Sequence, residues 1–220
     1  MQLSMSAWEK ARMSFSKILD SVAQYYTERV TTYGATARGV DWNSAESQEL
    51  RFEQLMKVCD VDQSFSINDY GCGYGALLDY LIERRYSFEY RGFDVSKQMI
   101  IEAKQQHEDA SDSQFFSDES VLAVADYTVA SGIFNVKLRT SDDDWKAYLL
   151  ETLQRLAELS RKGFAFNVLT SYSDRDRMRS DLYYADPAFL FDYCKRRFSR
   201  FVSLIHDYPL YEFTIIVRNR

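Results

Sequence analysis

The stretch Asp69-Tyr-Gly-Cys-Gly-Tyr-Gly75 constrains the fold of this chain more than any other, because it gathers glycine where glycine is otherwise scarce. Three of the eight glycines in 220 residues alternate here. The half-alternating apolar pattern of residues 65–70 predicts a strand, and the apolar spacing of residues 75–85 predicts a helix. A strand, a glycine turn and a helix place free backbone N–H groups close to a nucleotide-like ligand.

Two families of nucleotide-binding proteins use such a turn. Gly71, Gly73 and Ala76 satisfy the G-x-G-x-x-G/A fingerprint of dinucleotide-binding proteins. That fingerprint is weak by itself, and it leaves a NAD-dependent oxidoreductase as an alternative. An acid two places before the first glycine and a third glycine at Gly75 instead resemble motif I of the class I methyltransferases, which use S-adenosylmethionine.

Residues further along the chain extend this resemblance. The segment 90–96 is similar to the second strand of the family, whose terminal acid, here Asp94, binds the ribose hydroxyls. Asp94 lies 23 residues beyond Gly71 (94 − 71), near the spacing of about 20 expected for a ribose-binding carboxylate. Ser117 and Asp118 stand where the family contacts adenine, and residues 125–134 resemble its fourth strand. The cofactor-binding residues implied in this way are Arg51, Asp69, Gly71, Cys72, Gly73, Asp94, Val95, Met99, Ser117, Asp118, Ser131 and Gly132.

The roles of individual residues follow from the chemistry of that cofactor. Gly71 and Gly73 would let the backbone approach its amino acid moiety, and Asp69 would attract the ammonium group. Met99 would pack on the adenine face or simply within its helix. Arg51 would bind the cofactor carboxylate in a forked geometry, or lie on the surface with its stem over apolar area.

Strands and helices alternate after residue 60. The patterns predict strands at 65–70, 88–94, 113–116, 124–131 and 163–169, and helices at 75–85, 97–107, 142–159 and 187–197. Such alternation indicates a mostly parallel sheet with helices on both faces. Two β-rich runs, 201–205 and 212–217, flank a short connection that contains proline and predict an antiparallel hairpin. We therefore expect a doubly wound α/β fold with seven strands in the order 3-2-1-4-5-7-6, which is the methyltransferase layout.

The first 60 residues are expected to form a helical lid on a single domain spanning 1–220, with a Rossmann-like core at 61–220. An apolar stripe from Trp8 to Tyr26 predicts a first helix. A loop follows over 32–42, and Asn43 or Ser44 then caps a second helix. The chain leaves no room for the substrate domain that a nicotinamide-dependent dehydrogenase usually needs.

Aromatic side chains beyond the predicted strand ends are candidates for an acceptor pocket, since ligands of open α/β sheets bind at the carboxyl ends of the strands. The chain is 15% aromatic, so most of these rings must be core. His206, beside Asp207, is the candidate general base, with Asp174 behind it. His107 is expected on the surface at the end of a helix. The acceptor candidates are Tyr26, Trp42, Phe134, Asn135, Tyr172, Tyr183, Tyr184 and Tyr208.

Composition limits the class of protein further. The net charge of −6 argues against a nucleic-acid partner. No apolar run is long enough for a bilayer helix and the N-terminus lacks a signal-peptide layout, so we expect no membrane partner. Three scattered cysteines indicate reduced thiols and a cytoplasmic location. The acids at 142–144 are expected to favour a helix start, and we expect no metal site there.

Two short segments narrow the expected acceptor. Residues 164–174 and 182–187 resemble bacterial methyltransferases of small-molecule and surface-polysaccharide pathways. No Asp/Asn-Pro-Pro-Tyr motif follows the fourth strand and no Pro-Cys pair occurs, which counts against methylation of nucleic-acid bases. The resemblance thus implies an S-adenosylmethionine-dependent methyltransferase acting on oxygen or nitrogen of a small polar metabolite or sugar derivative. A catalytically silent subunit that keeps the cofactor fold is a further alternative.

Overall fold

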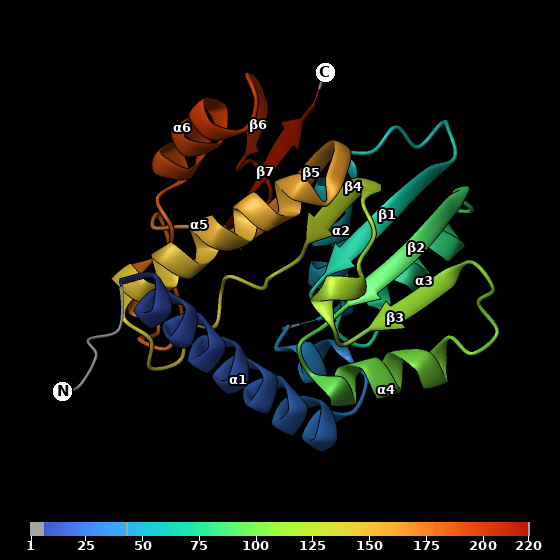
Figure 1. Ribbon diagram of the computed structural model, residues 1–220, viewed down its shortest axis with the longest axis horizontal. Helices are drawn as coiled ribbons and strands as arrows, with labels where there is room; N and C mark the ends of the chain where they lie inside the picture. The colour runs from blue at the N-terminus through green and yellow to red at the C-terminus, as the bar shows by residue number, and fades with distance from the viewer. Residues whose placement is uncertain (1–6, 43, 220) are drawn as a thin grey trace.

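One mixed sheet organises the chain, as the computed structural model in Figure 1 shows. Residues 7–42 and 44–219 are described, with side chains from residue 15 onward, so Asn43 and the Trp8 end of the predicted stripe lie outside the described residues. The strand order is β3-β2-β1-β4-β5-β7-β6, which confirms the predicted order. The strands are β1 (Phe65–Tyr70), β2 (Phe88–Phe93), β3 (Ser113–Phe116), β4 (Ala125–Ala130), β5 (Ser160–Leu169), β6 (Phe201–Ile205) and β7 (Glu212–Arg218).

Strand directions also agree with the sequence. The strands β1 to β5 pair in parallel, whereas β7 is antiparallel to both β5 and β6. The predicted hairpin therefore closes one side of the sheet. Strand β5 begins at residue 160 rather than 163, because its first residue pairs with Ala125 ahead of an irregularity in the β4 register.

Six α-helices in the described part of the chain cover the two faces of the sheet (Figure 1). One hydrophobic cluster joins α2, α3 and α4 to one face, and a second joins α1, α5 and α6 to the other. Such coverage explains why the central strand β1 is buried at every residue. The helices are α1 (Ala7–Tyr33), α2 (Ala45–Met56), α3 (Ala76–Glu83), α4 (Lys97–Gln106), α5 (Asp142–Glu158) and α6 (Pro187–Arg197).

Side-chain caps set the starts of several helices. Ser44 Oγ accepts from Ser47 N at 3.2 Å at the start of α2, which is one of the two predicted caps. Ser141 caps α5, and the three acids predicted to favour a helix start lie in its first turn. Among the described residues, no group of three potential metal-ligating side chains comes together.

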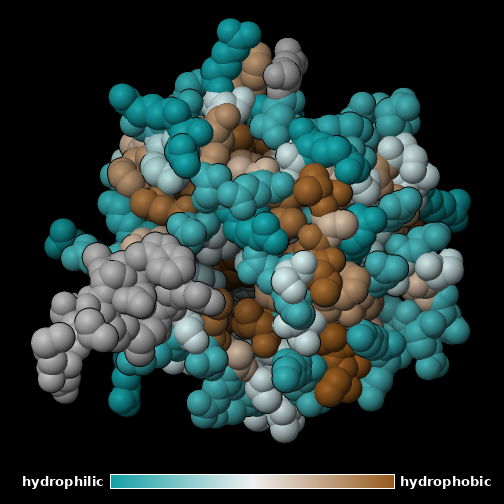
Figure 2. All heavy atoms as spheres, viewed as in Figure 1, coloured by the Kyte–Doolittle hydropathy of each residue, from teal (hydrophilic) through white to brown (hydrophobic). Residues whose placement is uncertain are grey.

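Hydrophobic side chains on the face shown in Figure 2 gather in patches near its middle, and hydrophilic ones cover most of its rim. In the described part of the chain, no helix combines the length and the apolar character needed to span a bilayer. Because β1, β2 and β4 are parallel neighbours, their carboxyl ends lie at one edge of the sheet. The candidate site forms at this edge.

Candidate functional site

The glycine turn after β1 adopts a backbone that other residues rarely adopt. Gly71, Gly73 and Gly75 have φ values of 86°, 55° and 94°. A Cβ at Gly71 would lie 2.2 Å from Ile133 Cγ2, and one at Gly73 would lie 2.9 Å from Val40 Cγ1. The turn therefore requires glycine both for its backbone angles and for close packing against neighbouring segments.

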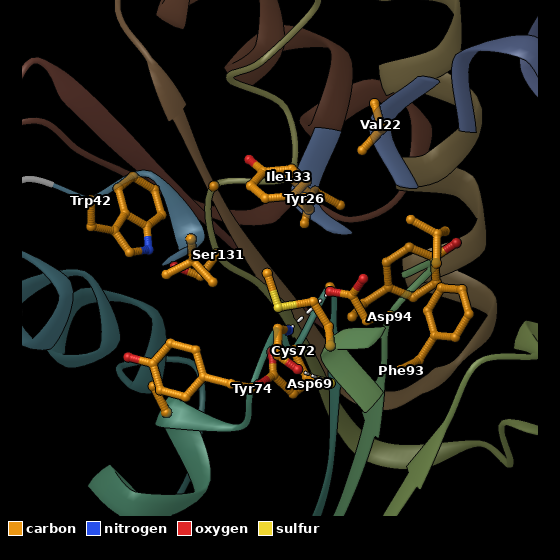
Figure 3. Close-up of a pocket in the computed structure, with 18 of the residues that line it drawn as sticks. Val22, Tyr26, Trp42, Asp69, Cys72, Tyr74, Phe93, Asp94, Ser131 and Ile133 are labelled. Atoms are coloured by element: carbon orange, nitrogen blue, oxygen red, sulfur yellow. Dashed lines mark hydrogen bonds between the residues drawn. The ribbon is translucent and has the colours of Figure 1, made fainter. Parts of the chain in front are cut away.

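Asp94, at the end of β2, holds this turn in place. Its Oδ2 accepts from Gly73 N at 2.9 Å (Figure 3), and its Oδ1 accepts from Ser96 N at 2.8 Å. Burial raises the pKa of the Asp94 carboxyl to about 6, although both hydrogen bonds favour its ionised form. The carboxylate thus ties β1 to β2 at the edge where the sheet opens.

Asp69 is a second buried carboxyl group at this edge. It accepts a hydrogen bond from the Tyr90 hydroxyl at 2.8 Å. Burial raises its pKa to about 7, the hydrogen bond from Tyr90 opposes this, and the charge of Asp94 adds to it. Neither Asp69 nor Asp94 has a cationic partner among the described residues. Two buried acids without a counter-ion favour a ligand that carries positive charge.

The end of β4 forms the opposite wall. Gly132 has a φ of 73°, and a Cβ there would lie 2.2 Å from the ring of Trp42. Its N–H donates to Asn167 Oδ1 at 2.6 Å. The neighbouring Ser131 Oγ is buried and has no hydrogen-bond partner among the described residues, so it is available to a ligand.

These groups surround what we call the motif cavity, which has about 800 Å³ of empty space partly continuous with solvent. Figure 3 shows Tyr26 of α1 and Trp42 beside the glycine turn, with Asp94 and Phe93 on the side away from Trp42. Tyr74 donates to Gln48 Oε1 of α2 at 3.1 Å, which joins the turn to the N-terminal segment. The cavity is lined by Val22, Tyr26, Val40, Trp42, Gln48, Phe52, Asp69, Tyr70, Gly71, Cys72, Gly73, Tyr74, Ala76, Phe93, Asp94, Val95, Met99, Ser131, Gly132, Ile133 and Tyr148.

A second cavity, with about 850 Å³ of empty space, adjoins the first. The two cavities share a wall made of Tyr26, Val40, Trp42 and Gly132. Charged and polar side chains are more frequent around the second cavity. Beyond the shared wall, its lining residues are Asp41, Arg51, Asn135, Val136, Leu169, Ser173, Arg177, Arg179, Leu182, Tyr184, Tyr211 and Glu212.

Nine of the twelve predicted cofactor residues line the motif cavity, namely Asp69, Gly71, Cys72, Gly73, Asp94, Val95, Met99, Ser131 and Gly132. Ser117 and Asp118 line neither cavity. Both are exposed. Asp118 caps a short 3₁₀ helix, Glu119–Val121, because its Oδ1 accepts from the N–H and the hydroxyl of Ser120. The structure therefore places these two side chains outside both cavities, and their contact with adenine stays a prediction.

Arg51 occupies neither of the two positions that the sequence predicts, which are the cofactor site and the surface. It is buried, with 6% of its surface exposed, and it lines the second cavity. Its Nε and Nη2 donate to Glu212 at 2.9 Å and 2.6 Å, and its guanidinium lies 3.9 Å from the centre of the Trp42 ring. Burial excludes the surface position, and the pair with Glu212 occupies the groups expected to bind a cofactor carboxylate.

Four of the eight acceptor candidates line the cavities: Tyr26, Trp42, Asn135 and Tyr184. Phe134 is fully buried against Phe166, and the Tyr208 hydroxyl bonds Thr214 in the interior. Tyr183 packs beside the core, and Tyr172 is 74% exposed. These four residues line neither cavity, because an aromatic residue near a strand end serves the core or the surface as readily as a pocket.

The predicted base is also outside the site. His206 is exposed and packs between Tyr172 and Phe213 without lining either cavity. Asp174, likewise exposed, accepts a hydrogen bond from the Tyr211 hydroxyl. His107 is not the surface residue that we expected, since its side chain is 4% exposed and its ring nitrogens lie 2.9 Å from Asp79 and from the Ala103 carbonyl.

Sequence reasoning missed several lining residues. Tyr74 lies inside the glycine motif itself, and Tyr148 reaches the cavity from the buried face of α5. Arg177 and Arg179 line the second cavity from the segment after β5. The three arginines at 175, 177 and 179 were a possible signal, because they concentrate positive charge in one short segment of an acidic chain.

Comparison with known proteins agrees with this geometry. No protein-family model matches the chain. A protein of Mycobacterium tuberculosis named as a methyltransferase, Rv1506c, is 53% identical over 163 residues, covering 74% of this chain and 98% of the relative. This relationship shows that the chain belongs to the methyltransferases, and its sheet is that of class I, the S-adenosylmethionine-dependent class that the sequence resembles.

Solved structures share the fold at low sequence identity. The DhpI–SAM–HEP complex is 15% identical with a TM-score of 0.61, covering 91% of this chain and 97% of that one. Magnesium protoporphyrin IX methyltransferase from Synechocystis PCC 6803, with bound SAM, is 13% identical with a TM-score of 0.52, covering 100% and 87%. The comparisons do not favour the oxidoreductase or the silent subunit.

Proposed function

We propose that the motif cavity holds S-adenosylmethionine and that the second cavity holds the methyl acceptor, a small polar metabolite or sugar derivative methylated on oxygen or nitrogen. The observation that carries this proposal is the wall that the two cavities share, formed by Tyr26, Val40, Trp42 and Gly132. Two adjoining cavities would hold the methyl donor and the acceptor next to each other, so that transfer can proceed in line. Such positioning can lower an activation barrier by about 7–11 kcal/mol.

The residues of the motif cavity fit the cofactor chemically. The ammonium and sulfonium groups are cationic, and Asp69 and Asp94 are buried acids without a counter-ion among the described residues. Asp94 would accept from the ribose hydroxyls, and Gly71 and Gly73 would let the backbone approach the amino acid moiety. The unpartnered Ser131 Oγ offers one further polar contact.

Segments of the N-terminal region would act as the predicted lid. Tyr26 of α1 and Trp42 line both cavities, and Gln48 and Phe52 of α2 line the motif cavity. Trp42 packs directly on Gly132. A cover of this kind would exclude water during transfer. We also propose that the enzyme is cytoplasmic and has no nucleic-acid or membrane partner, consistent with its net charge of −6.

The cofactor assignment is tested by calorimetry with S-adenosylhomocysteine, the demethylated product. We expect the wild-type protein to bind it and not to bind NAD. Asp94→Ala should weaken binding by about 1–3 kcal/mol, because it leaves ribose hydroxyls unpaired and frees the glycine turn. Asp118→Ala is the matched control, since Asp118 is an exposed carboxylate that lines neither cavity. Equal losses in the two variants would contradict the assignment of the motif cavity.

A further inference from the structure

The acids of the second cavity already have cationic partners. Asp41 accepts from Arg29 Nη2 at 2.7 Å and from the Tyr25 hydroxyl at 2.8 Å. Glu212 accepts two hydrogen bonds from Arg51 Nε and one from Nη2. Because both carboxylates are neutralised in this way, they do not supply negative charge to a ligand.

Donors in the same cavity remain available. Arg177 lines it, and none of the ion pairs in the described part of the chain includes Arg177. Arg179, exposed, pairs with its neighbour Asp181.

Two neutral side chains add donors. The Tyr184 hydroxyl accepts from Arg179 N at 3.0 Å, which leaves its own proton to donate. Asn135 accepts from Leu169 N at 3.0 Å through its amide oxygen, which leaves its amide nitrogen as a donor. The second cavity is thus rich in hydrogen-bond donors and holds one guanidinium without a counter-ion.

The shared wall holds no general base. Of its four residues, Tyr26 alone titrates, and burial raises its pKa further above the usual value of 10, so it stays protonated at neutral pH. His206 and His107 line neither cavity. A hydroxyl or protonated amine would need a base to remove its proton during methylation, whereas an oxygen that is already anionic would not.

We propose that the acceptor presents an anionic oxygen, of a carboxylate or a phosphoryl group, and that Arg177 binds this anion. The inference rests on the proposed function and narrows the chemical class of the acceptor. When bound, S-adenosylmethionine supplies a methyl group on a positively charged sulfur. A lone pair of the acceptor oxygen forms the new O–C bond while the S–C bond breaks and its electron pair stays on sulfur. The two charges cancel, a methyl ester results and no proton moves.

Binding of simple anions tests the role of Arg177. The protein is titrated by calorimetry with benzoate, phenylphosphonate and the neutral benzamide, with and without S-adenosylhomocysteine. We expect at least one anion to bind and benzamide not to bind. Arg177→Gln should weaken anion binding about tenfold, because a charge-assisted hydrogen bond from an exposed guanidinium is lost.

Arg175→Gln is the matched control, because Arg175 belongs to the same 3₁₀ turn, Arg175–Arg177, and lines neither cavity. It should leave anion binding unchanged. Binding of benzamide as tight as that of the anions, absence of anion binding, or equal loss in the two variants would each overturn the proposal. Failure to bind S-adenosylhomocysteine would contradict the proposed function instead, and the titration without it would still report on the anion.

Turnover separates the two sources of the anion. Pools of carboxylates, phosphonates and phosphate esters, neutral alcohols and amines are screened for methyl transfer. A carboxyl methyl ester releases methanol in mild base, and a phosphoryl methyl ester does not. At saturating S-adenosylmethionine, methylation of a carboxylate should proceed at a rate that is constant from about pH 6 to 9, since the acceptor is already ionised. Transfer only to alcohols or amines would refute the proposal, and transfer to none of the pools would count against the proposed function itself.

Discussion

Replacing Asp69 with asparagine should stabilise the ligand-free protein at pH 8 while weakening cofactor binding. The carboxyl group is buried, carries negative charge above its raised pKa and has no cationic partner among the described residues. Asparagine keeps an oxygen for the Tyr90 hydroxyl, which lies 2.8 Å from Asp69 Oδ2. It removes the buried charge, and with it the group proposed to attract the cofactor ammonium.

The magnitude follows from the pKa of Asp69, which burial raises from 3.8 to about 7. That difference of about 3 pH units corresponds to about 4 kcal/mol at about 1.4 kcal/mol per unit. An acid whose pKa is higher in the folded than in the unfolded chain loses stability as it ionises. Relative to the variant, the wild type should therefore lose stability as pH rises from about 4 to about 7, and remain level above that. Because the asparagine amide nitrogen gains no partner, we expect a net gain of about 1–2 kcal/mol at pH 8.

Urea denaturation of both proteins between pH 4 and pH 8 measures this difference. Asp94→Asn is the control, because Asp94 accepts from two backbone N–H groups and an amide can replace only one of these acceptors. That variant should gain less stability than Asp69→Asn at pH 8, because the lost backbone hydrogen bond offsets the removal of a charge whose pKa burial raises to about 6. The reasoning is refuted if Asp69→Asn is less stable than the wild type at pH 8, or if the difference does not change with pH.

Two further predictions concern residues whose position the structure revised. Arg51→Gln should lower the free energy of unfolding, measured by urea denaturation, by about 3–5 kcal/mol, because it leaves Glu212 buried without its partner. The double variant Arg51→Gln/Glu212→Gln should recover part of this loss. No recovery would argue against the buried pair as the cause. His206→Ala should leave the rate of methyl transfer unchanged across pH 6 to 9, since His206 lines neither cavity; a pH-dependent loss of turnover would restore its role as the base.

Local sequence was sufficient for the glycine turn and for most of the predicted residues that line the motif cavity. Gly71 and Gly73 follow β1 directly, and Asp94 ends the neighbouring strand, so chain order alone brings them together once the sheet is parallel. The strand order could be predicted for the same reason. The alternation of strands and helices and the final hairpin allow few arrangements of one sheet.

Tertiary structure alone decided the partners of residues far apart in the sequence. Arg51 and Glu212 are separated by 161 residues and meet because α2 packs near the start of β7. The roles of Phe134 in the core, Tyr172 at the surface and Tyr184 in the second cavity could not be separated, because burial depends on which elements cover each ring. The sequence by itself therefore determined the fold and the motif, whereas packing between distant segments decided which charges are paired and which side chains reach the second cavity.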